Sequence, residues 1–116
     1  QAENPGLEGK SFLAGRAAEY MRQEFSRLQG IEEVAAVLKV SPAHLSRCFK
    51  KEMGIPPIEF LTRQRIQAAM NQLLGTEKTV KEIAEENGFA CGNYFSKVFR
   101  RYAGVSPEIY RRRNRT

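Results

Sequence analysis

Apolar residues recur every three or four positions along most of the chain, which is the spacing of helices that bury one face. The first such stripe comprises Leu13, Ala17, Tyr20, Met21, Phe25 and Leu28, and Gly30 is expected to end that helix. A second stripe, over 57–74, comprises Ile58, Leu61, Ile66, Ala69, Met70, Leu73 and Leu74. At a rise of about 1.5 Å per residue, this segment predicts a rod of about 27 Å. No segment alternates polar and apolar positions as a strand does, so the pattern predicts an all-α fold.

Segment 31–60 is repeated at 80–110, at an offset of 49 residues that becomes 50 after a one-residue insertion. The matched pairs include Ile31 with Val80, Leu45 with Phe95, Phe49 with Phe99, Gly54 with Gly104 and Pro57 with Pro107. Two unrelated helices would share apolar spacing, but they would not also share glycine, proline and paired cations. The chain therefore contains one unit twice.

Each copy is predicted to form a short helix, a tight turn and a second helix. Thr79 and Glu82 have the spacing of a capping box, and Gly30 with Glu33 is its weaker counterpart. The left-handed turn residue is expected at Asn87-Gly88 in one copy and at Lys39 in the other. The remaining helix ends are also marked. Ser41-Pro42 and Ser106-Pro107 are expected to begin helices, and Gly54 and Gly104 are expected to end them. The second helices are thus predicted near 42–53 and 92–103.

These elements divide the chain into five expected parts. Residues 1–10 are expected to be a disordered tail or a remnant interdomain linker. The other parts are a first helix-turn-helix subdomain at 11–55, a linker helix at 56–75, a second helix-turn-helix subdomain at 76–110 and a basic tail at 111–116.

Charge is unevenly placed within the 116 residues, whose net charge is +6. Residues 1–40 carry 5 basic and 6 acidic side chains, whereas residues 41–116 carry 14 and 7. This asymmetry indicates an acidic partner, such as a nucleic acid or a membrane surface. The longest apolar run has five residues, from Val34 to Leu38, and a membrane helix needs about 20. We therefore expect no membrane span, and no leader with a positive end and an apolar core is evident.

Residue types for catalysis and metal binding are scarce. Cys48, Cys91 and His44 cannot supply the four ligands of a structural zinc site, and all 13 acidic residues are glutamate. No catalytic pair, phosphate-binding loop or metal cluster can be assembled. We expect no cofactor and no metal, and the chain is not expected to be an enzyme.

Each second helix combines an apolar stripe with a cationic face on another side. The stripes comprise Leu45, Cys48, Phe49 and Met53 in one copy, and Phe95, Val98, Phe99 and Tyr102 in the other. The cationic faces comprise Ala43, Ser46, Arg47 and Lys50, with Lys51 beside them, and Asn93, Ser96, Lys97 and Arg100, with Arg101 beside them. A helix that carries such a face after a sharp turn fits the major groove of DNA.

Two segments, SPAHLSRCFKKEMGIPP and IAEENGFACGNYFSKVFRRYAGVSPEIYR, closely resemble the DNA-binding domain of AraC/XylS-type bacterial transcription regulators. With the pattern Arg65-Ile66-x-x-Ala69-x-x-x-Leu73-Leu74, the resemblance covers about residues 12–111. It implies about seven helices, with two homeodomain-like helix-turn-helix subdomains joined by a long linker helix and reading adjacent major-groove segments.

The resemblance also implies site residues. Base contacts are expected from Ala43, Ser46, Arg47, Lys50, Gly92, Asn93, Ser96, Lys97 and Arg100. Phosphate contacts are expected from Gly30, Ile31, Lys51, Thr79, Val80 and Arg101, partly through amides at helix N-termini. Since Gly92 has no side chain and Ala43 has a small one, sequence preference is expected to depend largely on Arg47, Asn93 and Lys97.

The implied partners are the double-stranded DNA of a promoter operator, RNA polymerase as a further candidate, and a missing N-terminal effector or dimerisation domain. The isolated domain is expected to be monomeric, cytoplasmic, without a membrane partner, and to regulate transcription, often as an activator. The residues leave other interpretations open. The basic surface could dock an acidic protein or a membrane, the parent chain could carry a DNA-repair methyltransferase, and Arg111, Arg112, Arg113 and Arg115 could contact phosphates or be frayed, solvated ends.

Overall fold

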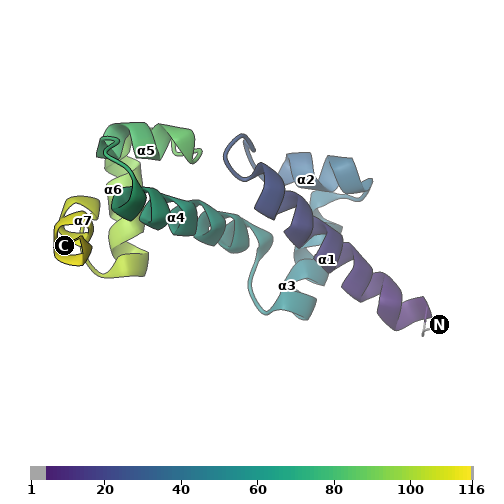
Figure 1. Cartoon of the computed structure of the whole chain (residues 1–116). Coiled ribbons are helices and arrows are strands. Elements are labelled where there is room, and N and C mark those ends of the chain that lie inside the picture. The colour runs from purple at the N-terminus through teal and green to yellow at the C-terminus, as the bar shows by residue number, and fades with distance from the viewer. Residues whose placement is uncertain (1–4, 116) are drawn as a thin grey trace. The chain divides into compact units, whose positions relative to one another are not determined.

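The structure is a computed structural model that describes the backbone of residues 5–115 and the side chains from Phe12 to Arg115. The described residues form seven helices and no strand, which confirms the all-α prediction (Figure 1). The helices are α1 (Pro5–Glu24), α2 (Ile31–Leu38), α3 (Pro42–Met53), α4 (Pro57–Gly75), α5 (Val80–Glu86), α6 (Gly92–Ala103) and α7 (Pro107–Asn114). None of the helices in this described part is long and apolar enough to cross a membrane.

The chain divides into two compact units, Gln1–Thr62 and Arg63–Thr116, and the boundary falls inside the continuous helix α4. Leu61 of α4 belongs to the core of the first unit. Ile66, Ala69 and Leu73 belong to the core of the second unit. The predicted linker helix at 56–75 is therefore also a packing element of both units, and the limits of the predicted domains stay a prediction.

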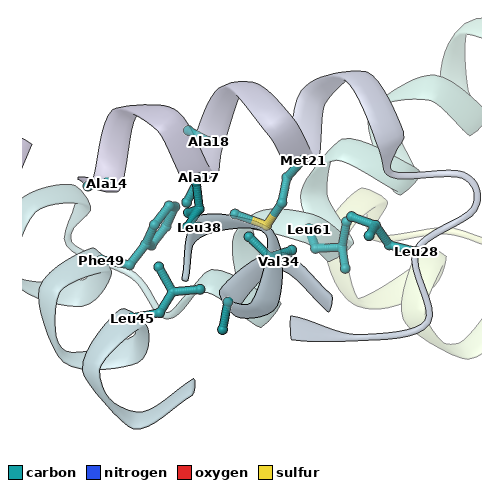
Figure 2. Close-up of a cluster of buried hydrophobic side chains, with 11 residues drawn as sticks. Ala14, Ala17, Ala18, Met21, Leu28, Val34, Leu38, Leu45, Phe49 and Leu61 are labelled. Atoms are coloured by element: carbon teal, nitrogen blue, oxygen red, sulfur yellow. The ribbon is translucent and has the colours of Figure 1, made fainter. Parts of the chain in front are cut away.

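Small side chains on α1 shape the core of the first unit. Ala14, Ala17 and Ala18 are buried, and small residues allow a neighbouring helix to approach closely. Figure 2 shows Ala17 and Met21 on the side of α1 that faces Phe49 and the other buried side chains of the cluster. Phe49 is fully buried and meets the Phe60 ring edge-on, with the two ring centroids 5.4 Å apart. This packing fixes one side of α3 against α1 and leaves its other side to solvent.

A chain of aromatic rings forms the core of the second unit. The ring centroids of Phe89 and Phe95 lie 4.9 Å apart, and those of Phe95 and Phe99 lie 5.6 Å apart. Tyr110 of α7 meets Phe99 edge-on at 5.4 Å. Phe95 and Phe99 are fully buried, so α6 is held by its apolar stripe as predicted.

The predicted turn residues adopt left-handed backbone conformations. Lys39, after α2, has φ 62°, and Gly88, after α5, has φ 92°. Gly54 and Gly104 have φ values of 85° and 84° and end α3 and α6. The two helix-turn-helix units therefore use the same turn geometry although one of them supplies it with a lysine.

Side chains cap most of the predicted helix starts. The Ser41 hydroxyl accepts a hydrogen bond from the His44 amide at 3.1 Å, and the Ser106 hydroxyl accepts one from the Ile109 amide at 3.2 Å. Thr79 and Glu82 form the full capping box, with distances of 3.0 and 2.8 Å. The Gly30 counterpart differs from the prediction, because Glu33 accepts from the amide of Gln29 and not from that of Gly30.

The two ends of the chain are more helical than predicted. Helix α1 begins at Pro5 and ends at Glu24, so residues 5–10 are helical and Gly30 is not the residue that ends the helix. Proline suits the first position of a helix because its φ is already helical and it needs no amide partner. Residues 1–4 lie outside the described residues. Helix α7 continues to Asn114, so residues 111–114 of the predicted basic tail are helical.

Several residues predicted to lie on buried stripes are not fully buried, and three of them are exposed. Met53, Ile58 and Leu74 are exposed, and each lies within two residues of the end of its helix, where the neighbouring helix no longer covers the stripe. Cys48 is half-buried at the margin of α3, with its sulfur 3.6 Å from Nε2 of exposed His44.

Candidate nucleic-acid interface

The predicted cationic face of α3 is exposed to solvent. Ser41 caps the helix and the buried residues Leu45 and Phe49 fix its rotation about its own axis. As a result, the α3 face, which consists of Ala43, Ser46, Arg47, Lys50 and Lys51, points away from the core, and all five residues are exposed. Four of these residues, Ser46, Arg47, Lys50 and Lys51, line an open surface hollow of about 470 Å³.

The equivalent face of α6 is built in the same way. Phe95, Val98 and Phe99 are buried and fix the rotation of the helix. The α6 face consists of Asn93, Ser96, Lys97, Arg100 and Arg101, all exposed except Ser96, which is half-buried. Gly92 is half-buried at the start of the helix, and a Cβ atom added there would meet nothing within 4 Å. Each set of predicted base-contacting residues is therefore brought together on one side of its own helix.

Four exposed cations of the two faces are available for an outside partner. Within the described residues, no carboxylate forms an ion pair with Arg47, Lys50, Lys97 or Arg100. Some cations elsewhere are paired, such as Arg22 with Glu19 at 3.5 Å and Lys78 with Glu86 at 2.7 Å. Unpaired cations on a face without carboxylates attract phosphate groups.

An acidic side chain of the second unit is held by neighbouring donors. Glu86 accepts hydrogen bonds from Lys78 Nζ at 2.7 Å and from Gln72 Nε2 at 2.9 Å. The hydrogen bond from Lys78, and to a smaller extent the one from Gln72, holds the pKa of the Glu86 carboxyl below its usual range. Asn87, the buried polar residue at the turn, also donates to Gln72 and to the Ile83 carbonyl. These contacts tie the turn to α4.

The predicted phosphate contacts lie at two helix starts and beside the two faces. Gly30 and Ile31 are half-buried at the start of α2, where Gly30 provides no side-chain cap. At the start of α5, the Thr79 amide already donates to Glu82, whereas Val80 follows as the first helical residue. Glu32 and Glu82 place carboxylates in these first turns, so any anion bound there must tolerate a nearby negative charge.

Two basic residues near the C-terminus have a role that the sequence did not indicate. Arg111 donates to the Leu73 carbonyl at 2.9 Å and to the Thr76 carbonyl at 3.1 Å. Arg115 also donates to the Thr76 carbonyl, at 3.1 Å, and pairs with Glu77. Both residues are half-buried, so they are neither frayed nor solvated ends. Their partners lie at least 35 residues away in the sequence, and no local pattern could reveal them.

Tyr94 is the second feature that sequence reasoning missed. It lies in the first turn of α6, next to Asn93, and 54% of its surface is exposed. The signal was present in the helical spacing, since Tyr94 lies three residues before Lys97 on the same side of the helix. The described residues contain no group of three or more His, Cys, Asp or Glu side chains that could hold a metal ion.

Two helix-turn-helix units, each presenting a cationic second helix, define a DNA-binding protein of the helix-turn-helix class. Residues 34–113 match the family described as a helix-turn-helix domain. This match, the curated relatives and the similar solved structures together show the family. The chain belongs to the AraC-type family of bacterial helix-turn-helix DNA-binding transcription regulators.

Among curated relatives, the HTH-type transcriptional regulator YfiF of Bacillus subtilis is 36% identical over 92 residues, which cover 79% of this chain and 29% of that protein. The bifunctional transcriptional activator and DNA repair enzyme AdaA of the same organism is 33% identical over 93 residues, covering 80% and 44%. The chain therefore spans less than half the length of these relatives. The shared family is one of transcription regulators and is not defined by an enzymatic activity.

Solved structures show the same fold. The C-terminal domain of AraT, a response regulator from Geobacillus stearothermophilus, has a TM-score of 0.85 at 42% identity, covering 90% of this chain and 87% of that one. The DNA-binding domain of the global transcriptional factor AdpA, in complex with a target DNA, has a TM-score of 0.81 at 26% identity, covering 86% and 90%.

Proposed function

We propose that this domain binds double-stranded DNA in a sequence-specific manner, with α3 and α6 as recognition helices that read adjacent major-groove segments. The observation that carries the proposal is the matched pair of exposed cationic faces, on which Arg47 and Lys50 of α3 and Lys97 and Arg100 of α6 form no ion pair with a carboxylate of the described residues. The similarity to AdpA, whose DNA-binding domain was solved with a target DNA, supports the choice of ligand.

Base contacts are proposed for the residues that point outward from the two recognition helices. Arg47 is the best candidate for a bidentate contact with guanine, which contributes about 1–3 kcal/mol of discrimination. Lys97 can donate to guanine, whereas the Asn93 side-chain amide can donate to N7 of adenine and accept from its N6 amino group. The full proposed set is Ala43, Ser46, Arg47, Lys50, Gly92, Asn93, Ser96, Lys97 and Arg100.

Phosphate contacts are proposed for residues at the margins of these helices and at the preceding helix starts. Lys51 and Arg101 lie beside the two faces and are exposed. Gly30, Ile31, Thr79 and Val80 would contribute backbone groups at the starts of α2 and α5. Such contacts position the protein on DNA and supply affinity, whereas base contacts supply sequence preference.

Selection from random duplex DNA tests the proposal. We expect two short preferred elements with centres about one helical turn, or about 34 Å, apart. Affinity for the selected duplex should fall steeply between two salt concentrations, because phosphate binding releases counterions. Recovery of a single element would contradict the use of two recognition helices. Equal binding to polyglutamate or to anionic vesicles, with no preferred DNA sequence, would instead support a general docking surface for acidic partners.

Arg47→Ala and Lys97→Ala test the two helices separately. Each change should relax the preference at a different position of the selected site, with a loss of about 1–3 kcal/mol against the preferred base. Repeating the selection with each variant measures this. Arg16→Ala is the matched control, because Arg16 is an exposed cation on α1 whose guanidinium lies over the Phe12 ring. Equal weakening on all sequences would identify Arg47 or Lys97 as a phosphate contact.

We further propose that the parent protein regulates transcription in the bacterial cytoplasm. An N-terminal domain would sense an effector or dimerise, the operator-bound protein would contact RNA polymerase, often as an activator, and the isolated DNA-binding domain would be a monomer. Sedimentation of this chain tests the monomer, and transcription in vitro from a promoter that carries the selected site tests the direction of regulation in the whole protein.

A further inference from the structure

We propose that Tyr94 is an additional DNA-reading residue of α6, and that its ring packs against the methyl group of a thymine in the major groove. This inference rests on the proposed function, because it requires α6 to lie in the groove. It adds an apolar contact with thymine to the proposed base contacts, and the charged residues of α6 cannot make such a contact.

Exposure sets Tyr94 apart from the other aromatic side chains of its unit. Tyr94 is 54% exposed, whereas Phe89 is 6% exposed and Phe95 and Phe99 are completely buried. Tyr102 and Tyr110 are half-buried. Tyr94 is therefore the one exposed ring of this unit, whose other aromatic side chains are half-buried or buried within the described residues.

The position of Tyr94 on α6 links this exposure to DNA binding. Residues three and seven positions further along a helix lie on the same side, and for Tyr94 these are Lys97 and Arg101. Both are exposed cations of the α6 face. Large apolar side chains are also exposed on α1, α2 and α4, and exposure by itself is common on protein surfaces. Tyr94 differs because it lies in the first turn of a recognition helix, beside cations that would contact DNA.

The ring is also held in place before any ligand binds. Its centroid lies 6.2 Å from that of Phe89, with the two planes at 52°, and Phe89 itself packs on Phe95. On α4, burial lowers the pKa of Arg65, and the proximity of Tyr94 opposes this shift. A side chain that is already ordered loses little conformational entropy on binding.

Groove chemistry identifies the group that the ring would contact. The base edges in the major groove present hydrogen-bond donors and acceptors, and the C5-methyl group of thymine is their one apolar group. The residue that matches Tyr94 in the first unit is His44, an exposed polar side chain on α3. The thymine contact is therefore expected only in the part of the site that is read by α6.

Replacement of each thymine in the selected site by uracil tests the contact, because uracil lacks only this methyl group. At one position in the α6 element, the wild type should lose about fourfold in affinity, as expected for one buried methyl group. Tyr94→Phe should keep this discrimination. Tyr94→Ala should bind the thymine and uracil duplexes equally at that position. Phe12→Ala, which removes an exposed ring from α1, should discriminate as the wild type does.

A second measurement does not depend on how any variant folds. With 5-iodouracil at the sensitive position, irradiation of the wild-type complex should cross-link the DNA to Tyr94, as mapped by mass spectrometry. A cross-link to another residue, or a Tyr94→Ala variant that still distinguishes thymine from uracil, would overturn the inference. So would a selected site at which no thymine is sensitive to its methyl group. Failure of the wild type to select any sequence would refute the proposed function itself.

Discussion

Gly54 and Gly104 show how single residues set the ends of the two recognition helices. Their φ values of 85° and 84° lie in the left-handed region, where glycine has no steric penalty. A Cβ atom added at either position would meet nothing within 4 Å. The requirement for glycine is therefore one of backbone conformation and not of space.

We expect Gly54→Ala and Gly104→Ala each to destabilise the protein by about 1 kcal/mol, because alanine must adopt a strained left-handed conformation. Urea unfolding followed by circular dichroism measures this. Gly15→Ala is the matched control, since Gly15 lies within α1 with no atom near the added Cβ. There the change should stabilise by up to about 1 kcal/mol. If all three substitutions changed the free energy of unfolding in the same direction, the explanation by backbone conformation would be wrong.

At this scale, the sequence predicted what depends on near neighbours in the chain. The exposure of Arg47 and Lys97 followed from helical spacing, and the left-handed backbone at Lys39 followed from its place in the repeat. The half-burial of Cys48 and the exposure of Met53 did not, because spacing locates the centre of a stripe but not how far a neighbouring helix covers it.

At the scale of elements, the end of α4 is stabilised by α7. The last carbonyls of a helix have no partner within it and carry partial negative charge. Arg111 satisfies one such group at Leu73, and both Arg111 and Arg115 bind the Thr76 carbonyl. The segment between α4 and α5, which precedes the Thr79 cap, is thereby fixed from α7.

Arg111→Ala should destabilise the second unit by about 2 kcal/mol, because the Leu73 and Thr76 carbonyls lose a charged donor. Arg111→Lys should recover only part of this loss, since lysine lacks the planar fork that reaches two acceptors. Arg112→Ala, in the next position and exposed, should change the free energy of unfolding by less than about 0.5 kcal/mol. If Arg111→Ala instead weakened DNA binding and left the stability unchanged, Arg111 would be a phosphate contact and not a residue that stabilises the end of α4.

Element boundaries could be predicted where capping is local. Ser41, Thr79 and Ser106 each bond an amide three residues ahead, so their signals lie within one helical turn of sequence. The extension of α1 to Pro5 and of α7 to Asn114 was missed, because polar, apolar-poor ends give no stripe to detect. The hydrogen bond from Arg111 to the Leu73 carbonyl was missed because it joins residues 38 positions apart.

At the scale of the whole molecule, α4 is the element that connects the two units. The boundary between the units lies within it, between Thr62 and Arg63, and no glycine or proline interrupts the helix between its first and last residues. A continuous helix is a stiffer connection than a flexible linker of the same number of residues. The repeat and the helical spacing of 57–74 predicted this connection, because both are properties of the sequence alone.

A stiff α4 should make DNA binding sensitive to the spacing of the two sequence elements. One added base pair moves an element by about 3.4 Å and rotates it by about 34° around the DNA axis. We therefore expect the wild type to lose most of its preference for the selected site when one base pair is inserted between the elements. Fluorescence anisotropy with duplexes of different spacing measures this loss.

The double variant Gln67→Gly/Asn71→Gly should tolerate the insertion better while binding the original spacing more weakly. Both residues are exposed on α4, and the glycines would weaken the helix by up to about 1 kcal/mol each without removing a core side chain. Gln67→Ala/Asn71→Ala keeps the helix and removes the same 3.4 Å side-chain hydrogen bond, so it should retain the strict spacing of the wild type. If the glycine and alanine variants responded alike to the inserted base pair, the stiffness of α4 would not be what couples the two recognition helices.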